Sequence, residues 1–209
     1  MTSSNRPRCS VCLRPASHCL CGLIPTLHSA VSVLVIQHPQ EQKHALNTGR
    51  LLVAGLANAE LAVIEQIPTD STLQMQLADP GWRTELLFPG AGAQPLSTAP
   101  EGDDRPRRLV LLDGTWRKAR KLLLLNPVLQ QLPRVALPAG LISRYRLRRT
   151  SEANALSTIE AGVQALQLTE PGSDYGALLL PFEALIEGQI EAMGAECYAR
   201  NHGPGRPGQ

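Results

Sequence analysis

The chain has 209 residues, a net charge of +2 and five cysteines. This length allows one domain with a sizeable core and a small appendage. No apolar run reaches the ~18 residues of a membrane-spanning helix, and the N-terminus lacks the apolar core of a signal peptide. We therefore expect a cytoplasmic protein with no membrane partner, whose cysteines are metal ligands or free thiols rather than disulfides.

The positive charge is concentrated in one stretch of the chain. Residues 105–149 hold 12 of the 20 Lys and Arg residues and a single acid, Asp113. Basic stretches are often only solvated surface, but a block this one-sided favours a polyanionic partner. We expect one basic face, built from this part of the chain.

The N-terminal residues form a cysteine-rich head. Cys9, Cys12, Cys19 and Cys21 are separated by two, six and one residues. Four thiols this close can surround one tetrahedral ion, and a segment this short has no apolar core without such a staple. We predict a structural zinc knuckle over residues 1–24. The alternative is a set of reduced thiols, with His18 as a competing ligand.

Strand and helix patterns alternate after the head. Apolar, β-branched runs predict strands over 30–36, 61–65, 84–88, 108–112 and 134–137. Helices are predicted over 41–57, over 116–125, from the capping box that begins at Ser157, and from Pro181 to Tyr198. This alternation indicates a parallel sheet with crossovers, an α/β domain over residues 25–200, followed by a disordered tail over 201–209.

The segment "LLDGTWRKARKLL" has an unusual charge distribution. Asp113 follows a buried strand, and four cations lie near the start of the next helix, where the macrodipole disfavours them. These cations are Arg117, Lys118, Arg120 and Lys121. A phosphate backbone lying across this edge of the sheet would explain them. In the simpler interpretation, Asp113 is a helix N-cap and Trp116 packs in the core.

Other polar or glycine-containing segments follow the first and third predicted strands. His38 and Asn47 lie after the first strand, where α/β proteins place ligand sites, although ordinary loop and helix residues fit equally well. Gly90 follows the third strand in "PGAGAQP". That segment lacks the third glycine and the prompt helix of a dinucleotide fingerprint, which we reject. A glycine-lined approach to a ligand remains an expectation there.

Arginines alternate with apolar residues after the fifth predicted strand. Arg144, Arg146 and Arg148 therefore share one side of an extended segment, with Tyr145 and Leu147 on the other. The segment is either part of a site near the fourth strand's loop or a solvated edge. Glu183, Glu187 and Glu191 form an acidic stripe on the last helix, which we expect to be a solvated face.

Four segments taken together resemble the DTW-domain family: "RCSVCLRPASHCLC", "HPQEQKHALNTGRLL", "LLDGTW" and "YRLRR…STIEA". The family is named for an Asp-x-Thr-Trp pattern, here Asp113, Thr115 and Trp116. The resemblance implies a tRNA-uridine aminocarboxypropyltransferase. Such an enzyme moves the 3-amino-3-carboxypropyl group of S-adenosylmethionine to a uridine, at position 47 of the variable loop, giving acp3U and methylthioadenosine. It also implies a SPOUT-like fold, a mostly parallel sheet with flanking helices and a C-terminal knot.

Roles follow from the resemblance and from the chemistry that it implies. The uracil imide nitrogen has to lose a proton, so Asp113 is a candidate general base, or an electrostatic or orienting group. Thr115 and Trp116 complete the catalytic candidates. The cofactor-binding candidates are Phe88, Pro89, Gly90, Leu112, Gly114, Arg146, Ser157 and Thr158. The RNA-binding candidates are Arg117, Lys118, Arg120, Lys121, Arg144, Arg148 and Arg149.

Two alternative functions stay open at this point. One is a SPOUT-type RNA methyltransferase that uses the same cofactor and differs in its product. The other is a zinc-stabilised RNA-binding module without catalysis, which cofactor binding would distinguish. In each case the expected partner is RNA, with tRNA preferred, and a monomer is the favoured assembly.

Overall fold

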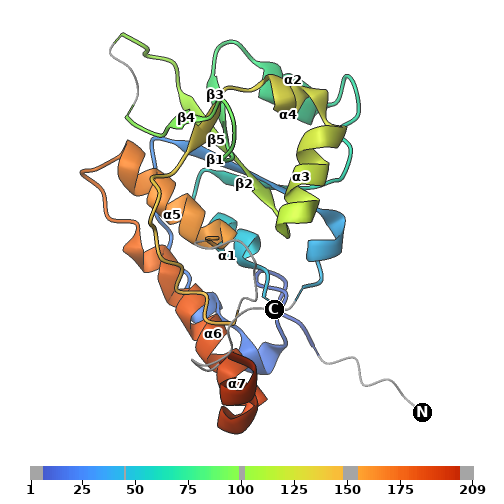
Figure 1. The fold of residues 1–209 in the computed structure, drawn as a ribbon, viewed down its shortest axis with the longest axis vertical. Helices are drawn as coiled ribbons and strands as arrows, with labels where there is room; N and C mark the ends of the chain where they lie inside the picture. Colours follow the sequence, from blue (N-terminus) through green and yellow to red (C-terminus); the bar gives the residue numbers. More distant parts are fainter. Residues whose placement is uncertain (1–6, 45, 99–101, 148–154, 203–209) are drawn as a thin grey trace.

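The computed structural model describes residues 7–44, 46–98, 102–147 and 155–202. Its centre is a six-stranded sheet in the order β2-β1-β5-β3-β6-β4, with parallel pairing throughout (Figure 1). The strands are β1 (Ser32–Gln37), β2 (Ala59–Val63), β3 (Arg83–Leu87), β4 (Gln94–Pro95), β5 (Arg107–Asp113) and β6 (Arg134–Ala136). The predicted α/β class with a mostly parallel sheet and flanking helices is confirmed.

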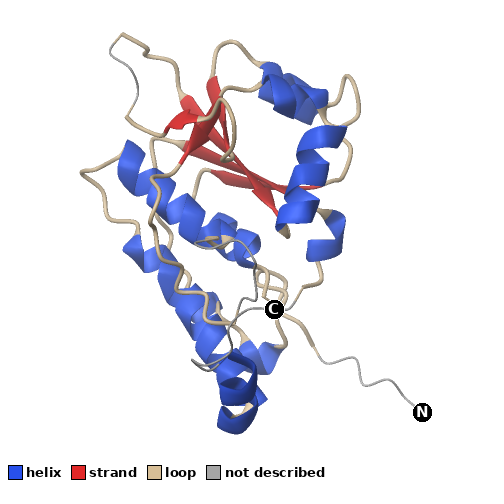
Figure 2. Cartoon of the chain, viewed as in Figure 1, coloured by secondary structure: helices blue, strands red, loops and turns tan. Residues whose placement is uncertain are grey.

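Helices cover both faces of the sheet (Figure 2). The α-helices are α1 (Thr48–Gly55), α2 (Thr72–Ala78), α3 (Trp116–Leu125), α4 (Pro127–Gln131), α5 (Thr158–Thr169), α6 (Leu180–Met193) and α7 (Ala195–His202). Short 3-10 turns are η1 (Ala16–His18), η2 (Cys21–Leu23), η3 (Pro39–Glu41) and η4 (Gly176–Leu179). No helix in the described ranges is long and apolar enough to span a bilayer.

The central strands are buried on both faces, which explains their continuous apolar runs. Because successive side chains point to opposite faces, Val33 and Val35 of β1 join one apolar cluster, with residues of α1, α5 and α6. Leu34 and Ile36 join the other, with residues of α2, α3 and α4. The sheet therefore separates two cores, and its carboxyl edge is left between the two helical layers.

The predicted helix over 41–57 is wrong in its first part. The turn η3 ends at Glu41, and α1 begins only at Thr48. The cause is Asn47, whose side-chain oxygen accepts the backbone N–H of Arg50 at 3.0 Å and caps α1. The chain between η3 and α1 is thereby available to border the carboxyl edge of the sheet.

The last predicted helix is interrupted. Gly194 has a φ of +81°, a conformation that favours glycine and ends α6 at Met193. A separate helix, α7, then runs to His202. The rest of the predicted tail, 203–209, lies outside the described residues.

The cysteine-rich head packs against the main domain. Cys12 and Leu20 are buried in the same apolar cluster as Phe182 and Leu185 of α6. The turn η2 also contacts α6. The head thus covers part of the outer surface of the α5–α6 layer.

Candidate functional site

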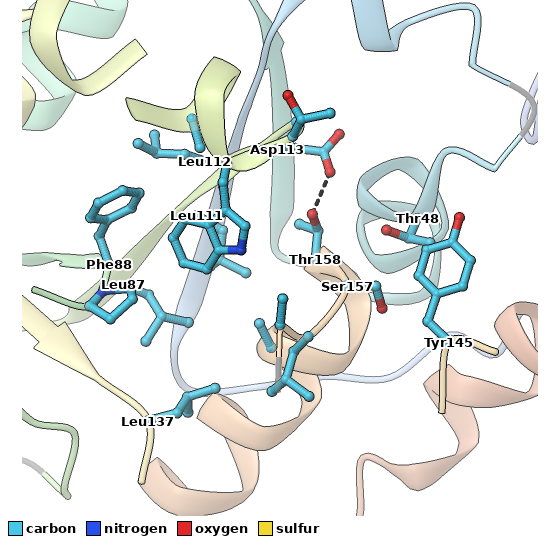
Figure 3. A pocket seen from close by; sticks show the side chains of 18 of the residues that line it. Thr48, Leu87, Phe88, Leu111, Leu112, Asp113, Leu137, Tyr145, Ser157 and Thr158 are labelled. Atoms are coloured by element: carbon cyan, nitrogen blue, oxygen red, sulfur yellow. Dashed lines mark hydrogen bonds between the residues drawn. The ribbon is translucent and has the colours of Figure 1, made fainter. Parts of the chain in front are cut away.

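A cleft of about 760 Å³ lies at the carboxyl edge of the sheet. It is lined by residues that follow β1, β3, β5 and β6 and by the start of α5. Figure 3 shows Phe88 and Leu87 on one side and Thr48 and Tyr145 on the other, with Asp113 between them. Parallel α/β domains bind ligands at this edge, and small-molecule sites span roughly 300–1,000 Å³. The cleft has the place and size of a small-molecule site.

Asp113 is the last residue of β5 and is only 6% exposed. Its Oδ2 accepts a hydrogen bond from Gln37 Nε2 at 2.6 Å, and its Oδ1 accepts one from the hydroxyl of Thr158 (Figure 3). The prediction that Asp113 lies at the carboxyl end of a buried strand is confirmed, although the strand includes Asp113. The N-cap interpretation is wrong, because Thr115 caps α3 by accepting the N–H of Lys118 at 3.4 Å.

Gly49 allows the Asp113 carboxylate to lie against the first turn of α1. A Cβ at Gly49 would lie 2.8 Å from Asp113 Cγ, closer than real side chains tolerate. Thr158, which donates to the same carboxylate, is the first residue of α5. The carboxylate therefore lies at the N-termini of two helices, whose dipoles stabilise its negative charge.

Gln37 connects Asp113 to the loop before α1. Its side chain is fully buried, and its Nε2 donates both to Asp113 and, at 3.0 Å, to Asn47 Oδ1. Both partners are acceptors, which fixes the orientation of the amide. Asn47 was a site candidate; it does not line the cleft but supports Asp113 through Gln37. Sequence reasoning missed Gln37, whose signal is its register opposite Asp113.

An aromatic wall closes one side of the cleft. The rings of Phe88 and Trp116 meet edge to face, with centroids 5.6 Å apart. Within the described residues, the buried Nε1 of Trp116 has no hydrogen-bond partner. Of the cofactor-binding candidates, Pro89, Leu112 and Gly114 line the cleft, whereas the exposed Gly90 does not. This wall offers an apolar surface beside the polar group around Asp113.

The loop after β6 forms the opposite border. Tyr145 and Leu147, which alternate with the arginines in the sequence, line the cleft. Arg144 and Arg146 point instead to α6, where Arg144 Nη1 lies 2.6 Å from Glu183 Oε1 and Arg146 pairs with Glu187. These ion pairs lie at the surface, where the Glu183 and Glu187 side chains are 45% and 57% exposed, so the expected solvated face is confirmed. Arg146, a cofactor-binding candidate, does not line the cleft.

The capping box at the start of α5 is confirmed. Glu160 is 5% exposed and accepts the Ser157 N–H at 2.8 Å and its hydroxyl at 2.6 Å. The same carboxylate accepts the hydroxyl of Ser143 and, at 2.6 Å, the N–H of Arg144. Ser157 and Thr158 both line the cleft, but the Ser157 hydroxyl is committed to Glu160.

Two of the four cations of α3 form ion pairs with acidic residues. Lys118 Nζ lies 2.6 Å from Glu41 Oε1, and Lys121 Nζ lies 2.6 Å from Glu65 Oε1. The hydrogen bond from Lys121 is the main cause of the lowered pKa of Glu65, and the hydrogen bond with His38 lowers it further. Arg117 and Arg120 are exposed on the same helix. The candidates Arg148 and Arg149 lie outside the described residues.

His38 is buried beside the cleft rather than in its lining. Its Nε2 lies 2.9 Å from Glu65 Oε1, and its Nδ1 accepts the N–H of Gln40 at 3.2 Å. Its backbone N–H donates to the carbonyl of Asp113 at 3.0 Å. His38 therefore holds the end of β1 against its neighbours and has no ring nitrogen directed at the cleft.

The four head cysteines can hold a metal ion. Their Sγ atoms all lie within 4.8 Å of one another, and His18 is not part of the group. The Cys9–Cys21 and Cys12–Cys19 sulfur distances are 3.4 and 3.8 Å, against about 3.8 Å in a tetrahedral Zn–thiolate site. Hydrogen bonds from the backbone of Cys12 and Val11 lower the pKa of Cys9 to about 6. This favours the thiolate, the form that binds metals, at Cys9, whereas burial and the hydrogen bond with Cys9 raise the pKa of Cys21 to about 12.

Sequence comparisons identify relatives over most of the chain. A tRNA-uridine aminocarboxypropyltransferase 2 of Drosophila melanogaster is 32% identical over 90% of this chain and 77% of its own. The protein of the same name from Macaca fascicularis is 30% identical over 90% of this chain, which spans 65% of that relative's length. A tRNA-uridine aminocarboxypropyltransferase A of Arabidopsis thaliana is 26% identical over 81% of this chain and 75% of its own.

No solved structure shows a significant match. The sequence profile of the DTW domain matches residues 6–190, which include the head cysteines, Asp113 and all but the end of the last helical layer. The chain belongs to the DTW-domain family.

Proposed function

We propose that this protein is a tRNA-uridine aminocarboxypropyltransferase that takes the 3-amino-3-carboxypropyl group from S-adenosylmethionine. The observation that carries the proposal is the convergence of the Asp-x-Thr-Trp segment on one cleft. Asp113, Thr115 and Trp116 all line it, and the Asp113 carboxylate is held by donors from β1 and α5. The names of the relatives supply the reaction, and the cleft supplies a place for it.

The cleft has an apolar side and a polar side, and S-adenosylmethionine has groups that suit both. Phe88 and Trp116 offer an apolar wall for a flat base, and Trp116 Nε1, which has no partner among the described residues, offers a donor. The hydroxyl of Thr158 and the start of α5 lie on the polar side, where a helix N-terminus favours the donor's carboxylate. Arg146 does not fill this role in our proposal, since it pairs with Glu187 outside the cleft.

Which group of S-adenosylmethionine is transferred depends on how the donor is oriented in the cleft. A sulfonium makes each of its three neighbouring carbons electrophilic, and the enzyme selects one by holding it in line with the nucleophile. Asp113 is suited to orient or stabilise charge there, because its carboxylate is fixed by Gln37 and Thr158. A rigid, buried anion near the bound donor would attract the positively charged sulfonium and hold it in one pose, a contribution to binding and orientation.

The tRNA-binding surface follows from the exposed cations beside the cleft. The helix α3 begins at the cleft wall with Trp116, and Arg117 and Arg120 are exposed on it. We assign them to phosphate contacts. Arg144 is exposed as well, but its guanidinium pairs with Glu183. Arg148 and Arg149 stay RNA-binding proposals from the sequence.

Three finer features of the molecule are part of the same proposal. The head cysteines bind zinc, because four thiolates at these distances suit its tetrahedral coordination. The fold is SPOUT-like with a C-terminal knot, a class that fits a cleft bordered by the loop after β6 and by α5. The head, 1–24, and the catalytic domain, 25–200, are the two units of the chain.

The test is a reaction with unmodified tRNA and S-adenosylmethionine, followed by mass spectrometry of the nucleosides and of the small-molecule products. The expected result is a 3-amino-3-carboxypropyl uridine together with methylthioadenosine. A methylated nucleoside with S-adenosylhomocysteine would show a methyltransferase instead. Binding of tRNA without any product from the zinc-loaded protein would favour a non-catalytic RNA-binding module.

A further inference from the structure

Two acidic side chains line the cleft within the described part of the chain, Asp113 and Glu41. Of these two, only Asp113 was predicted from the sequence to be part of the site. The two carboxylates differ in their hydrogen-bond partners, and we expect them to have different roles in the reaction. The inference below rests on the proposed function.

Asp113 is poorly suited to accept a proton. Each of its oxygens already accepts a hydrogen bond, from Gln37 Nε2 at 2.6 Å and from the Thr158 hydroxyl. Its side chain is buried against the first turn of α1. These donors and the two helix N-termini stabilise the ionised form, which weakens a base.

Glu41 is held differently, on a fixed backbone with one free oxygen. Its N–H donates to the carbonyl of His38 at 2.8 Å, and its carbonyl accepts Asn47 Nδ2 at 3.2 Å. Its Oε1 pairs with Lys118 Nζ at 2.6 Å, and the side chain is 14% exposed. Its Oε2 has no hydrogen-bond partner within the described residues.

The neighbouring titratable groups in the cleft are less suited than Glu41 to accept a proton. Lys118 is a cation on α3, and Asp113 is committed to its donors. His44 also lines the cleft, and its Nδ1 accepts the N–H of Leu46 at 3.2 Å. That bond puts the hydrogen of a neutral imidazole on Nε2, so neutral His44 has no free lone pair for a second proton.

We propose that Glu41 is the general base that takes the N3 proton of the target uridine. The N3–carbon bond forms as the carbon–sulfur bond of the sulfonium breaks, and the electron pair of that bond stays on sulfur. The N3 proton moves to Glu41 and then to solvent at the cleft mouth. The products are the N3-substituted uridine and neutral methylthioadenosine.

A matched pair of variants separates this chemistry from the anchoring of α3. Glu41 and Glu65 each hold a lysine of α3 at 2.6 Å, but Glu65 does not line the cleft. In Glu41→Gln we expect kcat to fall about 100-fold or more, as for loss of a general base, with KM for S-adenosylmethionine within a few-fold of the parent. Glu65→Gln removes a similar ion pair and is expected to keep the parent's kcat.

The pH profile of kcat gives a readout that a structural role would not move. The parent is expected to lose activity at low pH, and Glu41→Gln is expected to lack this acid limb. Lys118→Met keeps the carboxylate but removes the cation that stabilises it, so the acid limb is expected to move to higher pH. If Glu41→Gln fails to fold, this shift in Lys118→Met still tests the proposal.

The contradicting outcomes are distinct. Turnover of Glu41→Gln within a few-fold of the parent, or a loss confined to KM for S-adenosylmethionine, would overturn the role of Glu41 and leave the proposed function standing. An unmoved acid limb in Lys118→Met would also overturn it. A parent protein that makes no aminocarboxypropyl uridine would instead contradict the proposed function itself.

Discussion

The carboxylate of Asp113 accepts hydrogen bonds from two elements that are far apart in the sequence, β1 through Gln37 and α5 through Thr158. A strand-end aspartate in a basic stretch is visible in the sequence, and so its place was predicted. Its partners were not, because Gln37 looks like any residue at the end of a strand until the β1–β5 register pairs it with Asp113. Glu41 was missed because its lysine partner follows 77 positions later in the chain.

Replacement of Asp113 by Asn tests its role as an orienting anion. We expect Asp113→Asn to keep the fold, because the side chain retains its shape and one acceptor. Turnover should fall about 100-fold, since removing the charge and one acceptor loosens a geometry on which the transfer depends. The measurement is kcat together with tRNA affinity, which should change little.

Asp103→Asn is the control for that variant. Asp103 pairs with Arg105 at 2.9 Å, and this hydrogen bond is the main cause that lowers the pKa of Asp103 to about 2. It lies outside the cleft, so its loss should leave turnover unchanged. Equal activity of the two variants would reduce Asp113 to a structural residue.

Among the secondary-structure elements, the long apolar ones and the three-residue β6 were predicted, whereas α2, α4 and β4 were missed. The central strands and the capped start of α5 follow from residue patterns that depend on local sequence. The helices α2 and α4 have seven and five residues, too few for a clear helical period. Asn126 before α4 also bonds to the N–H of Ile67 at 2.7 Å, a tertiary contact that no local pattern reveals.

The carboxylate of Glu170, at the C-terminal end of α5, is expected to make the stability of the protein depend on pH. Glu170 accepts the Ser29 hydroxyl at 2.5 Å and the N–H groups of Ala30 and Val31 at 3.1 and 3.2 Å. Burial alone would raise the pKa of Glu170, but these donors outweigh it and lower the pKa. A lowered pKa in the folded state stabilises the protein above the carboxyl group's ordinary pKa of 4.5, and this contribution is lost as the pH falls through the folded-state value.

We therefore expect Glu170→Gln to lower the free energy of unfolding by about 1–2 kcal/mol at pH 7. The difference from the parent should shrink below about pH 4.5, where the carboxylate becomes protonated. Urea unfolding of the parent and the variant at pH 7 and below pH 4.5 measures this difference. Glu196→Gln, at an exposed position of α7, is the control. A difference that stays constant with pH would mean that the shape of the side chain, and not its charge, matters here.

At the scale of the whole molecule, the parallel order of the strands brings the site together. Residues after β1, β3, β5 and β6 meet at one edge because all these strands run the same way. The alternation of strands and helices predicts that edge, but it does not predict the strand order. The position of α5 beside β5 therefore became clear only from the structure.

Removal of the head metal tests how far the head supports the domain. Cys12 and Leu20 lie in the same core cluster as Leu185 and Ile186 of α6, so disorder in the head would expose part of that core. We expect about one zinc per chain by elemental analysis and a clear fall in Tm after chelation, because metal binding to such a head is coupled to its folding. Metal-free protein with the parent's Tm would contradict this prediction, and re-addition of zinc is the control.

The surface of α3 determines how tRNA affinity depends on salt. Each phosphate contact contributes about 0.7 to 0.9 to the slope of log affinity against log salt, because binding releases condensed counterions. Arg117→Ala and Arg120→Ala should each reduce the slope by about this amount. Lys121→Ala is the matched control on the same helix, since its ammonium group already pairs with Glu65 at 2.6 Å. If Lys121→Ala reduced the slope as much as the arginine variants, the ion pair of Lys121 with Glu65 would have to open on binding. Lys121 would then be an RNA-binding residue as well.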